Sequence, residues 1–447
     1  MKISIVGTGY VGLVSGACLA EVGHEVVCVD VDRDKVDRIN RGETPIHEEG
    51  LEALLRRHVG TRLKAGTDLR RAVHESEITF IAVGTPFDGE HIDLTFIRQV
   101  ARDIGTSLRD KNGYHVVVVK STVVPGTTDD VVLKVLEEAS GRRAGADFGV
   151  GMNPEFLTEG VAVSDFMEPD RIVVGGIDLR TTELIAAVYA TFKDVPLLRT
   201  NNKTAEMIKY TSNSVLATLI SFSNEIGNLC ERLGGVDVAD VMKGAHLARY
   251  FTTPLEDGRR VTAPIVAFLS AGCGFGGSCL PKDVKALAAQ GSAAGQPMPL
   301  LDTVIRINQQ QPRRVIDLVQ KHFPSLAGVR VSVLGLAFKP DTDDMRESPA
   351  IPIIRELLAR AAVVSAYDPV ATDAARKVLP PAGVRFASGL EDALEGADAA
   401  VLVTSWKEFG RIPGILGRLE RPPLIVDGRR MLDKQQVGRY EGIGLRH

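Results

Sequence analysis

Short apolar runs, each followed by a turn and a helix-compatible segment, recur through the first 200 residues of the chain. Residues 2–7 predict a buried strand, residues 13–22 favour a helix that ends at Gly23, and residues 24–32 predict a second strand. The same pattern predicts further strands at 78–86, 115–126 and 170–176. Strands that alternate with helices form a parallel sheet covered on both faces, so this part is expected to be a doubly wound α/β domain.

A long helical pattern and a second α/β pattern follow. Residues 203–233 contain no Pro and end at Gly234 and Gly235, so they predict one helix about 45 Å long at 1.5 Å per residue. Apolar runs return in the segments 329–340, 361–369, 397–405 and 422–428. The predicted fold class is α/β, with two Rossmann-like doubly wound domains joined by a long central helix. We expect three regions, 1–200, 201–325 and 326–447, with a linker at 322–328.

Composition and charge exclude several classes of protein. The 447 residues carry 53 Lys and Arg against 57 Asp and Glu, a net charge of −4 without blocks of one sign, so nucleic acid is not an expected partner. No apolar run reaches the roughly 18 residues that a membrane span needs, and the first strand leaves no room for a signal peptide. The 5 cysteines form no CxxC pair, which predicts reduced thiols in the cytoplasm and no metal site.

The first turn carries a dinucleotide-binding pattern. Gly7, Gly9 and Gly12 have GxGxxG spacing between the first strand and the first helix, and Asp30 lies near the end of the second strand. Such glycines let a pyrophosphate approach the start of the helix, and the carboxylate accepts hydrogen bonds from a ribose diol, which favours NAD over NADP. A chain with 44 glycines also produces this spacing by accident. The ordered strand, turn, helix, strand and acid make that alternative the weaker one.

Polar residues that follow other strands are expected at the same edge of the sheet. Thr85 comes after one strand, and Ser121 and Thr122 come after another. Ligands of doubly wound sheets bind beyond the carboxyl ends of the strands, so these residues are candidates for cofactor contacts. The alternative is that such residues only cap turns and helices, as Thr127 or Thr128 is expected to do.

A cysteine in the segment 274–283, GFGGSCLPKD, points to chemistry beyond a single hydride transfer. Cys279 lies among small residues just before a predicted helix that contains Pro281, Lys282 and Asp283. The helix start and Lys282 favour the thiolate form. A thiolate adds to an aldehyde, and the resulting tetrahedral centre loses hydride to give a thioester that water converts to an acid. Asp283 either assists that chemistry or is an ordinary acid of a first helical turn.

The long helix carries two further candidates, Lys209 and Asn213, four residues apart and therefore on one face. From the helix alone, a solvated face is the favoured interpretation.

The order of the motifs resembles the UDP-glucose/GDP-mannose dehydrogenase family over nearly the whole chain. The motifs that carry this resemblance are GTGYVG, VGTP, STVVPGTT, NPEFLTEG, PDRIVVG, KYTSN, FGGSCLPKD, FKPDTDDMRESPA and DGRR. The resemblance implies NAD as cofactor, a nucleotide sugar as substrate, and oxidation of C6 of UDP-glucose to UDP-glucuronate with 2 NAD consumed per sugar. The resemblance also implies that Lys209 and Asn213 on the long helix belong to the active site, which reverses the interpretation of a solvated face.

The resemblance also assigns roles to residues. It implies catalytic roles for Cys279, Lys209, Asn213, Asp283, Glu155 and Thr122. It implies cofactor contacts for Gly7, Gly9, Gly12, Asp30, Lys35, Thr85, Thr122, Glu159 and Arg346, with Glu159 one turn from Glu155 if that segment is helical. It implies substrate contacts for Glu155, Phe156, Leu157, Lys209, Asn213, Phe268, Gly276, Phe338, Lys339 and Arg429.

Several alternatives stay open from the sequence. The same chemistry on dTDP-glucose, GDP-mannose or an N-acetylated UDP-sugar fits the sequence equally well. A two-electron hydroxyacid dehydrogenase would not need Cys279. A catalytically silent nucleotide-sugar sensor would not need the residues with implied catalytic roles. The segment 246–269 is longer than in similar proteins, which often place an arginine there against the neighbouring subunit's substrate, so neither Arg259 nor Arg260 is assigned. A homodimer is expected, because the long helix has a second apolar face to bury.

Overall fold

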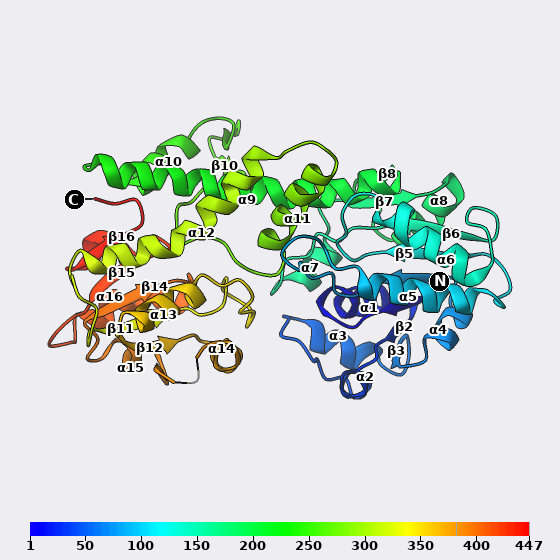
Figure 1. Ribbon diagram of the computed structural model, residues 1–447, viewed down its shortest axis with the longest axis horizontal. Coiled ribbons are helices and arrows are strands. Elements are labelled where there is room, and N and C mark those ends of the chain that lie inside the picture. Colours follow the sequence, from blue (N-terminus) through cyan, green and yellow to red (C-terminus); the bar gives the residue numbers. More distant parts are fainter. Residues whose placement is uncertain (381, 447) are drawn as a thin grey trace. The chain divides into compact units, whose positions relative to one another are not determined.

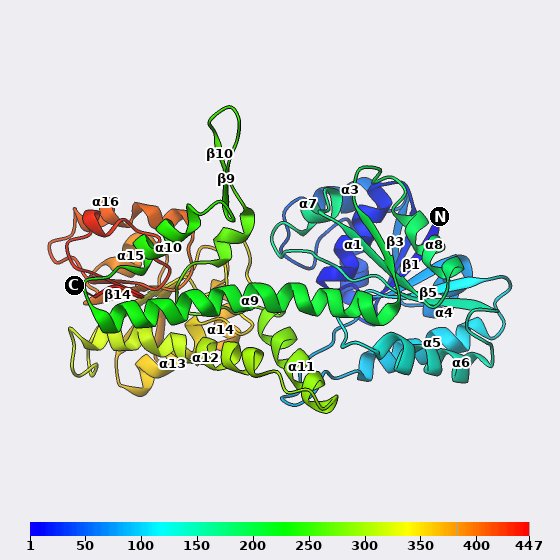
Figure 2. The same cartoon turned by 90° about the horizontal axis from the view of Figure 1, so that it is seen from above.

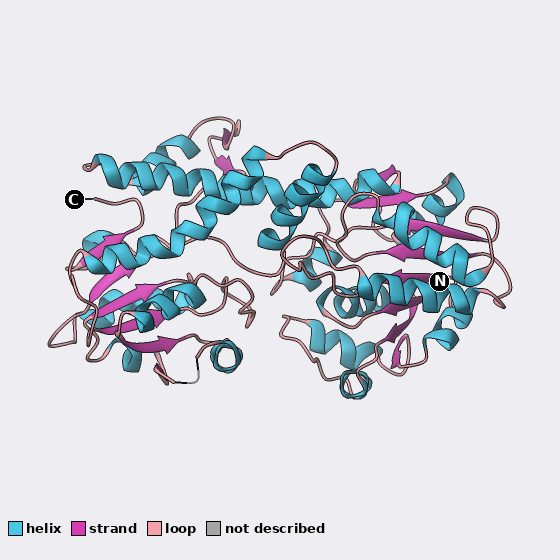
Figure 3. Cartoon of the chain, viewed as in Figure 1, coloured by secondary structure: helices cyan, strands magenta, loops and turns pink. Residues whose placement is uncertain are grey.

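The chain forms two compact units in a computed structural model that describes residues 1–380 and 382–446. The units are Met1–Ser212 and Asn213–His447. In each of them helices alternate with strands along the chain (Figures 1 and 3). No helix within the described residues is long and apolar enough to cross a membrane.

The first unit is built on an eight-stranded sheet in the order β3-β2-β1-β4-β5-β6-β7-β8. Its strands are β1 (Lys2–Val6), β2 (Glu25–Val29), β3 (Leu63–Gly66), β4 (Ile78–Ile81), β5 (His115–Val119), β6 (Phe148–Met152), β7 (Ile172–Gly176) and β8 (Leu197–Thr200). Neighbouring strands are parallel except β6 and β7, which are antiparallel. The central strands are mostly apolar and are buried on both sides, as strands of a covered parallel sheet must be. Their buried polar side chains Ser4, Thr79 and His115 hydrogen-bond to one another.

Helices cover both faces of this sheet. The helices of the unit are α1 (Tyr10–Glu21), α2 (Arg33–Asn40), α3 (Leu51–His58), α4 (Leu69–Glu75), α5 (Thr95–Leu108), η1 (Thr128–Val132), α6 (Leu133–Ser140), α7 (Ala162–Met167) and α8 (Leu179–Val188). One hydrophobic core joins the sheet to α1, α3, α7 and α8. A second core joins it to α4, α5 and α6. The unit is therefore doubly wound, as the alternation of strands and helices predicts.

The direction of the chain reverses between β6 and β7. The connection contains one helix, α7, which has 6 residues and extends about 9 Å. β7 runs antiparallel to β6, and its last residues, Gly175 and Gly176, pair with Met152 and Gly151 at the end of β6. The whole segment between the two strands stays at the carboxyl edge of the sheet, where doubly wound folds bind ligands.

The second unit contains a six-stranded parallel sheet in the order β13-β12-β11-β14-β15-β16. Its strands are β11 (Arg330–Leu334), β12 (Val363–Tyr367), β13 (Val384–Phe386), β14 (Ala399–Leu402), β15 (Leu424–Asp427) and β16 (Tyr440–Gly442). The helices of this sheet are α12 (Pro299–Gln320), α13 (Ala350–Ala359), α14 (Thr372–Val378), α15 (Leu390–Leu394), η3 (Lys407–Arg411), α16 (Ile412–Leu416) and η4 (Lys434–Gln436). Two hydrophobic cores lie on this sheet, one under α12 and α13 and one under α15 and α16.

The remaining elements belong to the long helix and the segment after it. They are α9 (Asn202–Leu233), α10 (Val238–His246), β9 (Thr252–Pro254), β10 (Arg260–Thr262), η2 (Pro264–Phe268) and α11 (Leu280–Ala293). The prediction of one uninterrupted helix is confirmed, since α9 has 32 residues. The longer segment after α10 forms the antiparallel hairpin β9-β10, which projects from the unit in Figure 2.

Some strand predictions differ from the structure. The apolar run predicted over 115–126 ends as a strand at Val119, because the following residues turn at the edge of the sheet and bond back to it through Ser121. The strands β3, β6 and β8 were not predicted. β6 has the sequence FGVGM, whose two glycines weaken the strand pattern, yet Gly151 allows the close approach of Ile185, which would lie 2.2 Å from an added Cβ.

A buried carboxyl group fastens the start of α9 to the loop after β5. The Glu206 side chain accepts hydrogen bonds from Gly126 N, Thr128 N and Thr128 Oγ1 at 2.6, 2.8 and 2.7 Å. Burial raises the pKa of this carboxyl from the ordinary 4.5 to about 7, although these donors act in the opposite direction. The folded state therefore favours protonated Glu206, and the stability that this group contributes is lost as the pH rises through about 7.

Glu206→Gln is expected to remove part of the pH dependence of stability. Between pH 5 and 8, the unfolding free energy of the wild type should fall relative to that of E206Q by about 2 kcal/mol. Urea unfolding at several pH values measures this difference. The exposed control Glu138→Gln should follow the wild type. Parallel pH curves for E206Q and the wild type would show that Glu206 does not titrate in this range.

Candidate functional site

The first turn of the sheet has the form of a dinucleotide-binding turn. Gly7 has a φ of +99°, which favours glycine, and a Cβ added to Gly12 would lie 1.9 Å from the Gly7 carbonyl oxygen. A Cβ added to Gly9, at the start of α1, would meet nothing within 4 Å. The turn is thus packed where it meets its own backbone and open where a pyrophosphate would approach the helix.

The predicted ribose carboxylate lies next to this turn. Asp30 Oδ2 accepts hydrogen bonds from Thr8 N and Thr8 Oγ1 at 2.8 and 2.6 Å, and Oδ1 accepts one from Asp32 N at 3.0 Å. Burial would raise the pKa of Asp30, but these donors and the Lys35 charge lower it below its ordinary value. The half-buried group is therefore an ionised acceptor, which suits ribose hydroxyls. These features fit NAD.

The two threonines expected at the same edge lie in contact. Thr85 Oγ1 donates a hydrogen bond to the Thr122 carbonyl oxygen at 2.7 Å. Ser121 bonds back to Ile81 O and Val83 O, so the loops after β4 and β5 are joined. The structure brings these predicted residues together at the carboxyl ends of neighbouring strands.

A buried ion pair joins the loop after β6 to α9. Lys209 Nζ lies 2.9 Å from Glu155 Oε1, and each side chain is 5% exposed. Glu155 Oε2 accepts a hydrogen bond from Leu157 N at 2.8 Å. Burial would raise the pKa of Glu155, but the charges of Lys209 and Lys120 and the hydrogen bonds lower it, so the group is a carboxylate. The solvated-face interpretation of α9 is wrong, because Lys209 and Asn213 are both buried.

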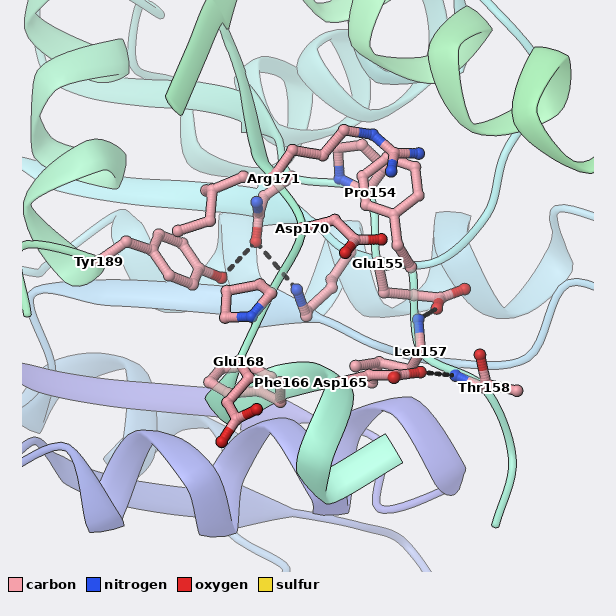
Figure 4. A pocket seen from close by; sticks show the side chains of 15 residues that line it. Pro154, Glu155, Leu157, Thr158, Asp165, Phe166, Glu168, Asp170, Arg171 and Tyr189 are labelled. Carbon is pink, nitrogen blue, oxygen red and sulfur yellow. Dashed lines mark hydrogen bonds between the residues drawn. The ribbon is translucent and has the colours of Figure 1, made fainter. Parts of the chain in front are cut away.

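The aromatic ring next to Glu155 lies close to two cations. The Arg171 guanidinium carbon lies 3.9 Å from the Phe156 ring centroid, and Lys209 Nζ lies 5.6 Å from it. Arg171 also donates a hydrogen bond to Ser212 Oγ on α9 at 3.1 Å. Leu157 lines the same cavity as Glu155 (Figure 4). Phe156 lines this cavity too. The backbone of 153–158 is not helical, so the predicted one-turn relation between Glu155 and Glu159 is wrong.

Within the second unit, the cysteine loop lies at the start of α11. Cys279 is exposed, whereas Cys18, Cys28, Cys230 and Cys273 are buried. Asp283 is buried in the first turn of α11. Its carboxylate accepts a hydrogen bond from Asn213 Nδ2 at 2.6 Å and pairs with Lys282 Nζ at 2.6 Å.

These contacts distinguish Asp283 from an ordinary first-turn acid. A buried carboxylate with an amide donor fixes the side chain of Asn213 on α9. The structure therefore brings together Asp283 and Asn213 in the unit that carries Cys279.

A second cavity gathers predicted substrate residues in the same unit. Phe268, Phe338, Lys339 and Arg429 line it, together with Thr404 and Ser405. Its volume of about 300 Å³ suits part of a small ligand. Gly276 lies at its edge, since an added Cβ would meet the Glu347 carbonyl oxygen at 2.3 Å and Phe338 Cβ at 3.0 Å. Arg346 also belongs to this unit, where it pairs with Asp344 at 2.7 Å.

Two residues that line the Glu155 cavity were not predicted from the sequence. Lys120 ends the run VVVVK after β5, and Asn153 begins the NPEF motif. Both are buried. A lysine directly after four consecutive valines of a strand is a signal that sequence reasoning could have used, because a buried ammonium needs polar partners.

Comparisons with known proteins agree with this geometry. Residues 1–193 match the NAD binding domain of the UDP-glucose/GDP-mannose dehydrogenase family, residues 203–310 its central domain, and residues 332–434 its UDP binding domain. The chain is 43% identical to the UDP-glucose 6-dehydrogenase AglM of Haloferax volcanii, over 99% of this chain and 100% of that one. It is 42% identical to the GDP-mannose 6-dehydrogenase of Pseudomonas aeruginosa, over 82% and 81% of the two chains.

A solved structure supports the fold. The UDP-glucose dehydrogenase of Pyrobaculum islandicum is similar with a TM-score of 0.89 at 38% identity, and the match covers 99% of this chain and 97% of that one.

The doubly wound fold and the glycine turn beside Asp30 fit an NAD-binding protein, and the matching family and relatives define an NAD-dependent dehydrogenase. The chain belongs to the UDP-glucose/GDP-mannose dehydrogenase family. It is an NAD-dependent enzyme that acts on a nucleotide sugar.

Proposed function

We propose that the enzyme oxidises the C6 hydroxymethyl group of UDP-glucose to a carboxylate, giving UDP-glucuronate with two NAD consumed per sugar. The observation that carries this proposal is the exposure of Cys279 alone among the five cysteines, in the family of dehydrogenases to which the chain belongs. An alcohol needs no thiol to become an aldehyde, whereas an aldehyde must first gain a nucleophile before it can lose hydride. Bound NAD supplies the hydride acceptor.

In this proposal each residue has a defined task. Glu155, as a carboxylate, accepts the proton of the alcohol in the first oxidation. The Cys279 thiolate then adds to the aldehyde carbon, and the Lys209 ammonium stabilises the negative charge on the oxygen. Loss of hydride leaves a thioester on Cys279.

Hydrolysis completes the reaction. Water adds to the thioester carbon while a carboxylate accepts a proton from it, and the carbon–sulfur bond breaks to release the acid and the thiolate. Asp283, whose carboxylate is held by Asn213 and Lys282, is the residue that we assign to this proton transfer. Phe268, Phe338, Lys339 and Arg429 hold the nucleotide part, since they line one cavity.

GDP-mannose is the second candidate substrate, because a GDP-mannose 6-dehydrogenase is 42% identical to the chain. The proposal favours UDP-glucose, since the chain aligns with the whole length of the UDP-glucose 6-dehydrogenase of Haloferax volcanii at 43% identity.

Initial rates of NADH formation with UDP-glucose, GDP-mannose, dTDP-glucose and an N-acetylated UDP-sugar test the substrate. We expect kcat/KM to be at least about tenfold higher for UDP-glucose than for the others, a difference of about 1.4 kcal/mol.

Cys279→Ser should lower the rate of acid formation at least about a hundredfold, because the weaker nucleophile leaves the aldehyde unoxidised. The buried control Cys273→Ser should retain turnover once corrected for folded protein.

Other outcomes identify the alternatives. Full conversion to the acid by C279S would contradict the thioester route. Binding of UDP-glucose without NADH formation would make the protein a nucleotide-sugar sensor. A single oxidation of a hydroxyacid, with no reaction of nucleotide sugars, would favour the hydroxyacid dehydrogenase.

We also propose a cytoplasmic homodimer. None of the five cysteines forms a disulfide within the described residues, which fits a reducing compartment. Val215, Phe222 and Leu229 recur every seven residues on α9 and are 45%, 51% and 53% exposed. An apolar stripe of this kind fits burial against a second copy of the chain.

Phe222→Asp is expected to dissociate this dimer. Sedimentation of the wild type should give twice the chain mass of 48.1 kDa, and that of F222D should give the mass of one chain. The control Leu179→Asp changes an exposed apolar residue on α8 and should leave the dimer intact. A wild type that sediments as one chain would contradict the proposal.

A further inference from the structure

Lys120 is a buried cation to which the proposed reaction gives no task. It follows β5, at the carboxyl edge of the sheet, and 4% of its surface is exposed. It lines the same cavity as Glu155, which has a volume of about 150 Å³, enough for several water molecules. A buried ammonium is retained only where polar or charged groups compensate its desolvation.

The hydrogen bonds of Lys120 are fixed by a polar network. Lys120 Nζ donates to Asn153 Oδ1 at 2.9 Å, and the Tyr189 hydroxyl donates to the same oxygen at 2.6 Å. Asn153 Nδ2 donates to the Val173 carbonyl oxygen at 2.8 Å, which determines the orientation of the amide. The Lys120 ammonium is therefore held against Asn153, which lies two residues before Glu155 in the chain.

Glu155 pairs with one cation, Lys209, and shares its cavity with a second, Lys120. Lys209 comes from α9, and Lys120 comes from the end of β5. The segment after β6 contributes Glu155, and the residue after α8 contributes Tyr189. The remaining charged groups that line the cavity are Asp165 of α7 and Glu168, Asp170 and Arg171 of the segment before β7. Glu168 and Asp170 are exposed, so solvent screens them more than the buried groups.

We infer that Lys120 is a positioning residue that keeps Glu155 in its carboxylate form and so sets the lower pH limit at which the site works. The inference rests on the proposed role of Glu155 as the base of alcohol oxidation. One ammonium in direct contact neutralises one carboxylate, and a second buried ammonium makes protonation of that carboxylate still less favourable. Burial lowers the pKa of Lys120 itself to about 8, so its charge is present throughout the acid range in which Glu155 would take up a proton.

Three variants test this role. Lys120→Met removes the charge and keeps a chain of similar length, whereas Lys120→Arg keeps the charge and a donor for Asn153, with the cavity beside it to receive the larger group. Lys111→Met is the control for loss of a buried lysine in the same unit, because Lys111 Nζ donates to the carbonyl oxygens of Val73, His74 and Ser76 and does not line the cavity.

The readout is the pH profile of kcat/KM for the best nucleotide-sugar substrate from pH 5 to 9. In K120M the acid limb should move to higher pH by about one unit, with little change at pH 8 to 9. K120R and K111M, corrected for folded protein, should keep the wild-type limb. If the acid limb of the K120M pH profile lies at the same pH as in the wild type, the inference is overturned. An equal shift in K120R and K120M would also overturn it, because packing rather than charge would then be responsible.

A thermal double-mutant cycle tests the same coupling without catalysis. Lys120→Met should lower Tm by at least about 3 °C more in the wild type than in the Glu155→Gln background, because the cation loses its anionic partner there. Equal effects in both backgrounds would contradict the inference even if turnover stands. If no nucleotide sugar is oxidised, the proposed function fails, and the cycle alone decides whether Lys120 acts on Glu155.

Discussion

The buried ion pair of Glu155 and Lys209 is the interaction on which the arrangement of the first unit's site depends. Two charges with 5% exposure each are tolerated only when they meet closely, and they do so at 2.9 Å. The pair fixes the loop after β6 against α9, and it leaves an ionised carboxylate and an ammonium at the carboxyl edge of the sheet. Removal of either partner would leave the other buried and uncompensated.

Neighbouring contacts restrict both partners of that pair. Arg171 stacks on Phe156 and bonds to Ser212, so the loop is held to α9 a second time. One turn before Lys209, Glu206 holds α9 to the loop of Gly126 and Thr128. The segment from β6 to β7 carries Glu155, Phe156 and Arg171 at one edge of the sheet. The position of the ammonium is thus determined by the packing of one helix end against three loops.

Local features of the site were predictable from the sequence, and long-range ones were not. The glycine turn and Asp30 follow from spacing within 30 residues, because a strand, a tight turn and a helix constrain one another directly. The exposure of Cys279 follows from its small neighbours and the helix after it. In contrast, a lysine and an asparagine on a helix favour a solvated face until a partner is known. The partners of Lys209 and Asn213 lie 54 and 70 residues away, at Glu155 and Asp283. Lys120 and the reversal at β7 depend equally on tertiary contacts that periodicity does not encode.

The measurement that tests the central claim most directly is the number of NADH molecules formed per molecule of limiting UDP-glucose with NAD in excess. A four-electron oxidation through Cys279 predicts two NADH per sugar, with UDP-glucuronate as the product. One NADH per sugar would mean that the reaction ends at the aldehyde or a ketone and that the thiol has no part in it, which would contradict the account.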